Sequence, residues 1–224
     1  MNQTMIDERV RDFAAPTDGA TSGRLVFKRG ASNLDIRFDP GMSDLFRAHF
    51  DGPVPDVEVD RGVVSVRYHH LSPAEWAKFA LLGGHHAAEF TLNAGLPWQL
   101  EVRGGVSRLE ADLSGLPLVG IEIRGGASRV ELVLGQAAGI VPIVVRGGVS
   151  NFRIQRPAGV GVRTMVRGGI SKLALDSMYL GAIGGASRLQ TPVWNDASGY
   201  EIEIAGGASH LTIEPLNGAP TRPA

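Results

Sequence analysis

Six serines recur in the phrase Gly-Gly-x-Ser, and they are the first residues whose type and spacing could support chemistry. The serines are Ser107, Ser128, Ser150, Ser171, Ser187 and Ser209, separated by 21, 22, 21, 16 and 22 residues. A serine nucleophile sits once, in a strained Gly-x-Ser-x-Gly turn beside a histidine. The sequence Gly126-Ala127-Ser128-Arg129-Val130 lacks the last glycine, and catalysis does not need six copies. We therefore interpret the serines as structural.

This interpretation gives both parts of the phrase a role at a chain corner. The serine hydroxyls would bond the corner backbone or the next coil. The glycines would allow a positive φ where the chain turns. The glycines that directly precede x-Ser are Gly105, Gly126, Gly148 and Gly169.

Four arginines stand four residues before serines of the repeat and could bind an anion. They are Arg103, Arg124, Arg146 and Arg167. If the repeats stack, these arginines form a file at the inter-strand spacing of about 4.8 Å, where like charges repel. Two roles remain open: guanidinium groups that bond corner carbonyls and stack on one another, or a site for an anionic ligand or acidic polymer.

The residues two positions before these arginines determine whether a negative charge lies beside each positive one. Glu101 and Glu122 hold these positions in the first two copies. Val144 and Met165 hold them in the next two, so we expect Arg146 and Arg167 to be less compensated.

Four histidines, His69, His70, His85 and His86, flank a predicted short helix. Imidazoles from converging loops bind zinc or nickel. Adjacent histidines in a strand point to opposite faces, so at most one of each pair could face a shared ion. We expect neither a metal nor a cofactor.

Trp194 lies in a longer loop beside the one copy with 16-residue spacing. A shortened coil would leave a notch, and an aromatic beside a notch is a candidate ligand or partner contact. A tryptophan that packs over the irregular coil is the alternative.

Alternating aliphatic residues surround every copy, as in Leu109, Ala111 and Leu113. This period places one face of each strand in a core. One coil of about 21 residues cannot offset its own conformational entropy, whereas stacked coils complete each other's burial. The sequence therefore predicts an all-β, single-stranded parallel β-helix with coils of roughly 21 residues. A hairpin meander is the competing arrangement.

The expected organisation is one solenoid with two extensions. Residues 1–23 form a flexible N-terminal extension, residues 24–214 the β-solenoid, and residues 215–224 a flexible tail. Coils are irregular over 24–95 and regular over 96–214. Ser72-Pro73-Ala74-Glu75 has the capping signature of a helix start, which predicts one short helix docked on the solenoid.

Composition excludes several classes of protein. The 22 basic and 23 acidic residues nearly cancel, so no net field favours nucleic acid. The chain has no cysteine, and its first residues lack the basic and apolar regions of a signal peptide. No apolar run is long enough to insert into a membrane. We expect a cytoplasmic protein.

Between Leu96 and Ile213 the sequence resembles bacterial domains of unknown function that are labelled adhesin-like or toast-rack domains. The segments that carry this resemblance are LEVRGGVSRLEADL, RPAGVGVRTMVRGGISKLALD and YEIEIAGGASHLTI. The resemblance implies a β-solenoid without known enzyme activity, and it supplies no functional residues.

Three functions follow from these observations as hypotheses. The first is a non-catalytic scaffold or interaction module that binds a protein partner or a second copy of the chain. The alternative is an anionic-ligand or polysaccharide-binding module that uses the arginine file. The third, a carbohydrate-active enzyme, rests on fold analogy alone and requires converging carboxylates.

Overall fold

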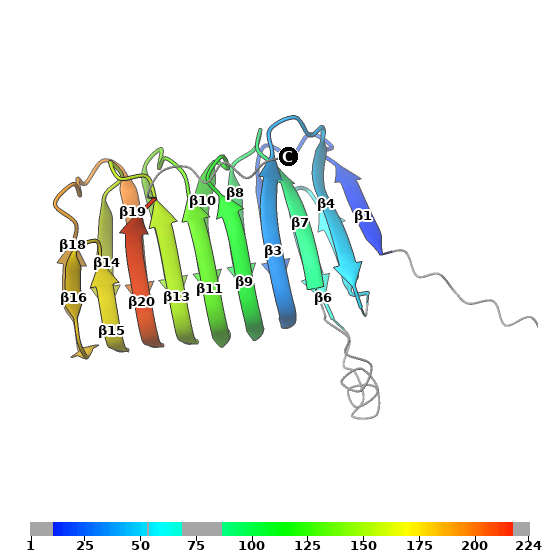
Figure 1. The fold of residues 1–224 in the computed structure, drawn as a ribbon. Helices are drawn as coiled ribbons and strands as arrows, with labels where there is room; N and C mark the ends of the chain where they lie inside the picture. The colour runs from blue at the N-terminus through cyan, green and yellow to red at the C-terminus, as the bar shows by residue number, and fades with distance from the viewer. Residues whose placement is uncertain (1–10, 53, 69–86, 217–224) are drawn as a thin grey trace, which may run out of the picture.

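The protein is all-β and consists of two mostly parallel sheets that face each other in a solenoid-like stack (Figure 1). The computed structural model describes residues 11–52, 54–68 and 87–216. These ranges contain no helix. The predicted helix that begins at Ser72 lies outside the described residues, as do His69, His70, His85 and His86.

Sheet A has eleven strands and sheet B has nine. In spatial order, sheet A contains β1 (Asp12–Pro16), β4 (Asp44–Asp51), β7 (Ala87–Asn93), β3 (Ala31–Asp39), β9 (Val106–Leu113), β11 (Ala127–Leu134), β13 (Gly148–Arg156), β20 (Gly207–Pro215), β15 (Gly169–Leu175) and β16 (Met178–Leu180), with β17 (Ile183–Gly184) also on β15. Sheet B contains β18 (Ser187–Gln190), β14 (Val162–Val166), β19 (Gly199–Ile204), β12 (Ile140–Val145), β10 (Leu118–Ile123), β8 (Trp98–Val102), β2 (Gly23–Phe27), β6 (Val63–Arg67) and β5 (Asp56–Asp60).

A regular rung is one strand of sheet B, a Gly-Gly corner and one strand of sheet A. The rungs stack in phase: Ala127 pairs with Val106 on one side and with Val149 on the other. The serines that follow these residues therefore share one file. The predicted stacking of equivalent positions is confirmed, and the meander is excluded because these strands pair in parallel.

The spatial order of the rungs departs from the chain order at both ends. The rung β19–β20 lies between β12–β13 and β14–β15, although it comes last in the chain. Likewise, β2–β3 lies between β8–β9 and the pair β6 and β7. As a result, Ser209 stands between Ser150 and Ser171 in the file. We call β8 to β13 the middle of the stack, and β14 to β20 its C-side end.

The copy with 16-residue spacing is not a shortened coil with a notch, as the sequence suggested. The chain turns back after β15, where Asp176 has a φ of 51°. Strands β16 and β17 then run antiparallel to β15, and β18 runs antiparallel to β14. The segment is a reversed coil that covers the last rung.

The glycines of the Gly-Gly corners have a different role from the one expected. None of Gly105, Gly126, Gly148 and Gly169 has a positive φ, so that expectation is wrong. The first glycine of each pair is the constrained one: a Cβ on Gly147 would lie 2.0 Å from the carbonyl oxygen of Gly125. Successive corners therefore approach too closely for any side chain.

At the N-terminal side, the structured part begins inside the predicted flexible extension. Residues 12–16 form β1, which pairs antiparallel with β4 at the edge of sheet A. Phe13 of β1 packs edge-on against Phe50, with ring centroids 5.5 Å apart. This aromatic contact ties the edge strand to the core.

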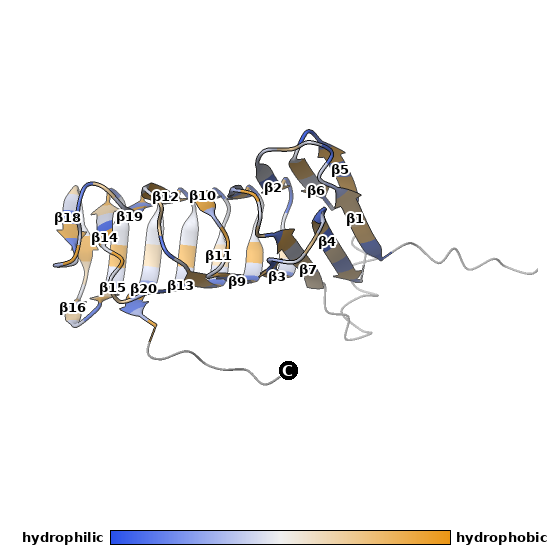
Figure 2. Ribbon diagram, turned by 90° about the horizontal axis from the view of Figure 1, so that it is seen from above, coloured by the Kyte–Doolittle hydropathy of each residue, from blue (hydrophilic) through white to orange (hydrophobic). Residues whose placement is uncertain are grey.

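The core fills the space between the sheets along the whole stack (Figure 2). Inward residues of the middle are aliphatic and almost fully buried, for example Val130, Leu132 and Leu134. Most outward residues are polar or charged, with Val119 and Ile140 among the exceptions. The outer faces of the two sheets are therefore the surfaces on which a functional site must be sought.

Candidate functional site

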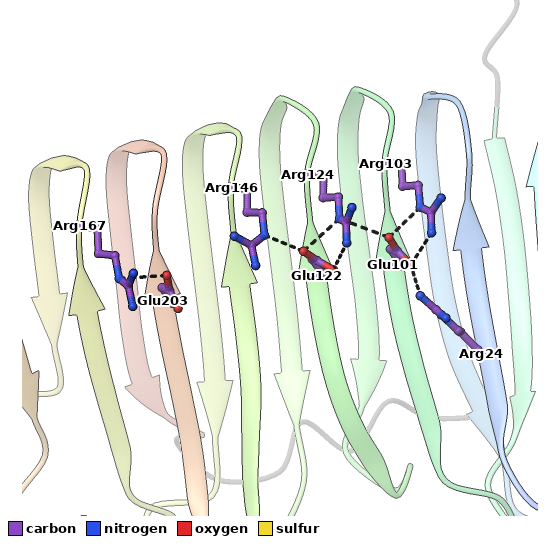
Figure 3. A network of polar contacts seen from close by, with 8 residues as sticks. All are labelled: Arg24, Glu101, Arg103, Glu122, Arg124, Arg146, Arg167 and Glu203. Carbon is purple, nitrogen blue, oxygen red and sulfur yellow. Dashed lines mark hydrogen bonds and ion pairs between the residues drawn. The ribbon is translucent and has the colours of Figure 1, made fainter.

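The structure brings the four predicted arginines together on the outer face of sheet B (Figure 3). Each arginine directly follows a strand, β8, β10, β12 or β14, at the corner of its rung. Ala205, which follows β19, stands between Arg146 and Arg167 because β19 is inserted there. Arg24 of β2 joins the group through Glu101. We call Arg24, Arg103, Arg124, Arg146 and Arg167 the arginine face.

Glu101 is the most enclosed carboxylate of this surface, with a side chain that is 0% exposed. It accepts hydrogen bonds from Arg103 Nε at 2.7 Å and from Arg24 Nη2 at 2.6 Å. Arg124 Nε lies 3.4 Å from the same carboxylate. The hydrogen bond from Arg103 lowers the pKa of Glu101, although burial acts in the opposite direction.

Glu122 is shared in the same way on the next strand. It accepts hydrogen bonds from Arg124 Nη2 at 3.0 Å and from Arg146 Nε at 2.8 Å. The hydrogen bond from Arg124 is the main cause that lowers the pKa of Glu122. Its carboxylate is therefore charged and held from two sides.

Arg146 and Arg167 are both paired, contrary to the expectation that they are less compensated. Arg146 reaches back to Glu122 of the preceding rung. Arg167 meets Glu203 of β19 at 3.2 Å. The sequence argument failed for Arg167 because it placed β14 beside β12, whereas the inserted β19 supplies the glutamate. Glu203 and Arg24 were missed for the same reason: only the spatial order shows that they are neighbours.

The balance of this network leaves a positive surface. Five guanidinium groups share three carboxylates. The side chains of Glu101, Glu122 and Glu203 are 0%, 16% and 23% exposed, whereas those of the five arginines are 40–63% exposed. The carboxylates thus lie beneath the arginines, and solvent meets mainly guanidinium groups.

Trp194 packs within the C-side end. The guanidinium carbon of Arg163 lies 4.6 Å from the centroid of its ring, and its indole nitrogen donates to Asp196 at 3.3 Å. Arg163 also pairs with Asp196 at 3.0 Å and with Glu201. One face of the indole is therefore occupied by a cation from the same chain.

Five of the six repeated serines are exposed and do not make the expected contacts, whereas Ser187 is half-buried and does. In the described part of the chain, Ser187 alone donates its hydroxyl to a corner carbonyl, that of Gly184, at 3.2 Å. The other five serines, from Ser107 to Ser209, have no hydrogen bond through their hydroxyls there. Ser150, Ser209 and Ser171 line an open hollow of about 710 Å³ at the C-side corners. The structure gives no internal contact that explains the choice of serine.

Residues 11–52, 54–68 and 87–216 hold no group of three histidine, aspartate or glutamate side chains placed to bind a metal. His49 forms only a pair with Asp12, at 2.7 Å. Within the same ranges, no helix has the length and apolar character needed to span a bilayer.

Comparison with known proteins identifies the family of the chain. A family model described as the N-terminal domain of toast_rack, DUF2154, matches residues 5–155, which is more than half of the chain. The chain belongs to this family. No curated protein matches the sequence significantly.

Two solved structures resemble this toast_rack domain. A "putative cell adhesion protein" from Clostridium sporogenes is 17% identical, with a TM-score of 0.63, and the match covers 91% of this chain and 97% of that one. At this identity the likeness shows the fold alone. A "putative adhesin" from Bacteroides fragilis is 8% identical over 92% of this chain and 95% of the other, and its TM-score of 0.25 carries no argument.

Proposed function

We propose that this toast_rack domain is a non-catalytic interaction module that binds an anionic polymer through the arginine face. The observation that carries the proposal is the layering of charge on sheet B. Half-exposed guanidinium groups lie over carboxylates that are at most 23% exposed. An approaching anion would therefore meet donors before it meets like charge.

The arginines are also held in place before any partner arrives. Arg146 uses Nε for its hydrogen bond to Glu122, and its two terminal amino groups have no partner among the described residues. A guanidinium fixed in this way can bond a carboxylate, sulfate or phosphate with little further loss of side-chain entropy. Arg103, Arg124 and Arg146 follow neighbouring parallel strands about 4.8 Å apart, and Arg167 follows two strands further on. This spacing suits a polymer that carries charge at intervals.

The state of the buried carboxylates supports a binding role over glycoside hydrolysis. That reaction needs one carboxyl group with a raised pKa as general acid and a second as base or nucleophile. Glu101 and Glu122 instead have lowered pKa values and are each held by at least two arginines. Both are charged, and neither is free to exchange a proton with a substrate.

Heparin retention tests the proposal. The double variant Arg146→Gln/Arg167→Gln removes two guanidinium groups from the arginine face, and we expect it to elute at clearly lower salt than the native protein. A matched control, Arg108→Gln/Arg129→Gln, removes the same charge from the outer face of sheet A and should elute close to the native position. Equal elution of the two double variants, with native circular dichroism for both, would show that net charge and not the arginine face governs binding.

Self-association through the C-side end is the second candidate function. Six large hydrophobic residues of the described chain are exposed, and Met178, Tyr179 and Val193 of this end are three of them. Exposed apolar side chains beside open strand edges favour contact between protein molecules. We expect light scattering to show a mass that rises with concentration and returns to the monomer in Met178→Gln/Val193→Gln. A strict monomer at high concentration would argue against this candidate.

A further inference from the structure

A hollow of about 400 Å³ lies on the outer face of sheet A at the C-side end, on the opposite sheet from the arginine face. Its outward side chains are Lys172 and Ala174 of β15, Tyr179 of β16, and His210 and Thr212 of β20. These three strands are neighbours in the sheet (Figure 1). We call these five residues the Tyr179 hollow.

The hollow exists because side-chain size changes along one row of the sheet. In the middle, this row consists of Glu110, Glu131 and Arg153, which are long and charged. It continues through Thr212 and Ala174 to Tyr179. Small side chains thus stand beside an aromatic ring, which leaves Tyr179 80% exposed, the highest value among the large hydrophobic residues of the described chain.

The polar groups around this ring are available to a ligand. Lys172 and His210 are paired in register on neighbouring strands, one row from Ala174 and Thr212. The nearest carboxylates along these strands are already engaged: Asp176 binds Arg156, and Glu214 binds Arg153. Within the described residues Lys172 forms no ion pair, and the Thr212 hydroxyl makes no hydrogen bond.

We infer that the Tyr179 hollow binds a sugar acid, a single pyranose ring that carries a carboxylate. The C–H face of a pyranose is apolar and packs on an exposed aromatic ring, while Lys172 supplies the cation for the carboxylate. His210 and Thr212 offer hydrogen bonds to the ring hydroxyls. Ala174 forms the floor because a larger side chain there would fill the space.

The dimensions fit one ring. Strands lie about 4.8 Å apart, so Tyr179 and Thr212, on either side of the strand that carries Ala174, stand roughly 10 Å from each other. The hollow is open to solvent and offers few polar groups, so we expect binding in the millimolar range, typical of small polar ligands at shallow sites. The site is independent of the arginine face, with which it shares no residue, and Tyr179 is the residue that it shares with the surface considered for self-association.

Titration by two-dimensional NMR tests the inference with two matched sugars. Methyl glucuronide should shift the amide signals of Ala174, Tyr179 and Thr212, and it should bind at least tenfold more tightly than methyl glucoside, which lacks the carboxylate. Lys172→Gln should reduce glucuronide affinity to that of the glucoside. Tyr179→Ala should weaken both sugars by at least tenfold, whereas Tyr179→Phe should stay within threefold of the native protein.

Four results would overturn the inference. Equal affinity for the two sugars would remove the role of Lys172, and unchanged binding in Tyr179→Ala would remove the aromatic platform. If Tyr179→Ala altered the molecular mass in solution but not the sugar titration, the tyrosine would belong to a contact between copies. Arg146→Gln/Arg167→Gln must keep native glucuronide binding; its loss would locate the sugar on the arginine face, which would support the proposed function and not this inference.

Discussion

The middle of the stack and its C-side end use the same repeat in two different ways. In the middle, rungs that follow one another in the chain are neighbours in space, and parallel pairing runs without interruption from β8 to β12 and from β9 to β13. At the C-side end, β19 and β20 are inserted and a reversed coil covers the last rung. The comparison shows that the repeat determines which positions lie over one another, but not which rung lies beside which.

The two regions also handle charge differently. In the ion pairs of the middle, the carboxylates of Glu101 and Glu122 are the enclosed partners, and the arginines are about half exposed. The C-side end contains Arg156, whose side chain is 1% exposed and whose Nη2 lies 2.7 Å from both carboxylate oxygens of Asp176. This pair joins the end of β13 to the turn after β15, with β20 between these two strands. An inserted rung is thus secured by an ion pair whose cation is buried, whereas in the middle the buried partner is the carboxylate of Glu101.

The largest effect is expected from Asp176→Asn. The change leaves the buried Arg156 without a charged partner, which costs about 3 kcal/mol in the free energy of unfolding. Asparagine tolerates the positive φ at this position, so the effect reports the charge and not the turn. Urea denaturation measures it.

The matched control in the middle is Asp112→Asn, whose carboxylate is exposed and accepts a hydrogen bond from the Ser114 hydroxyl at 2.7 Å. We expect a loss of less than about 0.5 kcal/mol there. Equal losses at the two sites would contradict the distinction between the regions.

Alanine substitution of paired glycines should give opposite results in the two regions. In the middle, Gly147→Ala should destabilise the protein by about 1–3 kcal/mol or more because its Cβ would meet backbone. Gly148 has nothing within 4 Å, so Gly148→Ala should stay within about 0.5 kcal/mol.

In the reversed coil of the C-side end, the second glycine should matter instead. Gly185 has a φ of 71° and open space around it, whereas a Cβ on Gly184 would have its nearest neighbour at 3.9 Å. Gly185→Ala should therefore cost about 1 kcal/mol through backbone strain, and Gly184→Ala much less. The melting temperatures of the four variants test this comparison. The same order of destabilisation in both corners would contradict it.

The smallest expected effect is acid sensitivity contributed by Glu101 and Glu122. Both have folded pKa values below the ordinary 4.5. A lowered folded pKa stabilises the native state fully above pH 4.5, and this stabilisation is lost as the pH falls through the folded value. Glu101→Gln should be less stable than the native protein at pH 7, and the difference should shrink toward pH 3. A difference that stays constant with pH would contradict the role of ionised Glu101.

The stacking of equivalent positions in this fold could be predicted from sequence, whereas the spatial order of its rungs could not. The positions that stack on one another can be identified in the sequence, because Arg103, Arg124 and Arg146 recur at fixed distances from their serines. The spatial order of the rungs cannot be identified in this way. Rungs with the same residue pattern can exchange places, and equivalent positions still stack on one another. A partial signal existed at the copy ending in Ser187, which has Ile183 where four of the other copies have arginine and follows after only 16 residues.

The arginine site was predicted in position but not in its partners. The spacing of the arginines places them on one surface, and the structure confirms that they come together. Glu203 compensates Arg167, and Arg24 shares Glu101; both residues reach the network only through the inserted rungs β19–β20 and β2–β3. The role of the corner glycines was also predicted wrongly. The close approach that requires them occurs between two rungs, so the sequence of one rung does not distinguish it from a need for positive φ.

The insertion of β19–β20 also has a consequence for synthesis on the ribosome. Strands β14 and β15 emerge first, yet their permanent partners on one side are made more than thirty residues later, between Gly199 and Pro215. Until then, β12 and β13 expose the edges that the final rung will occupy, and premature docking of β14–β15 onto them would give a register-compatible but wrong order. The reversed coil made in the interval, which covers the far side of β14–β15, can hold that rung as a separate unit until the last one arrives.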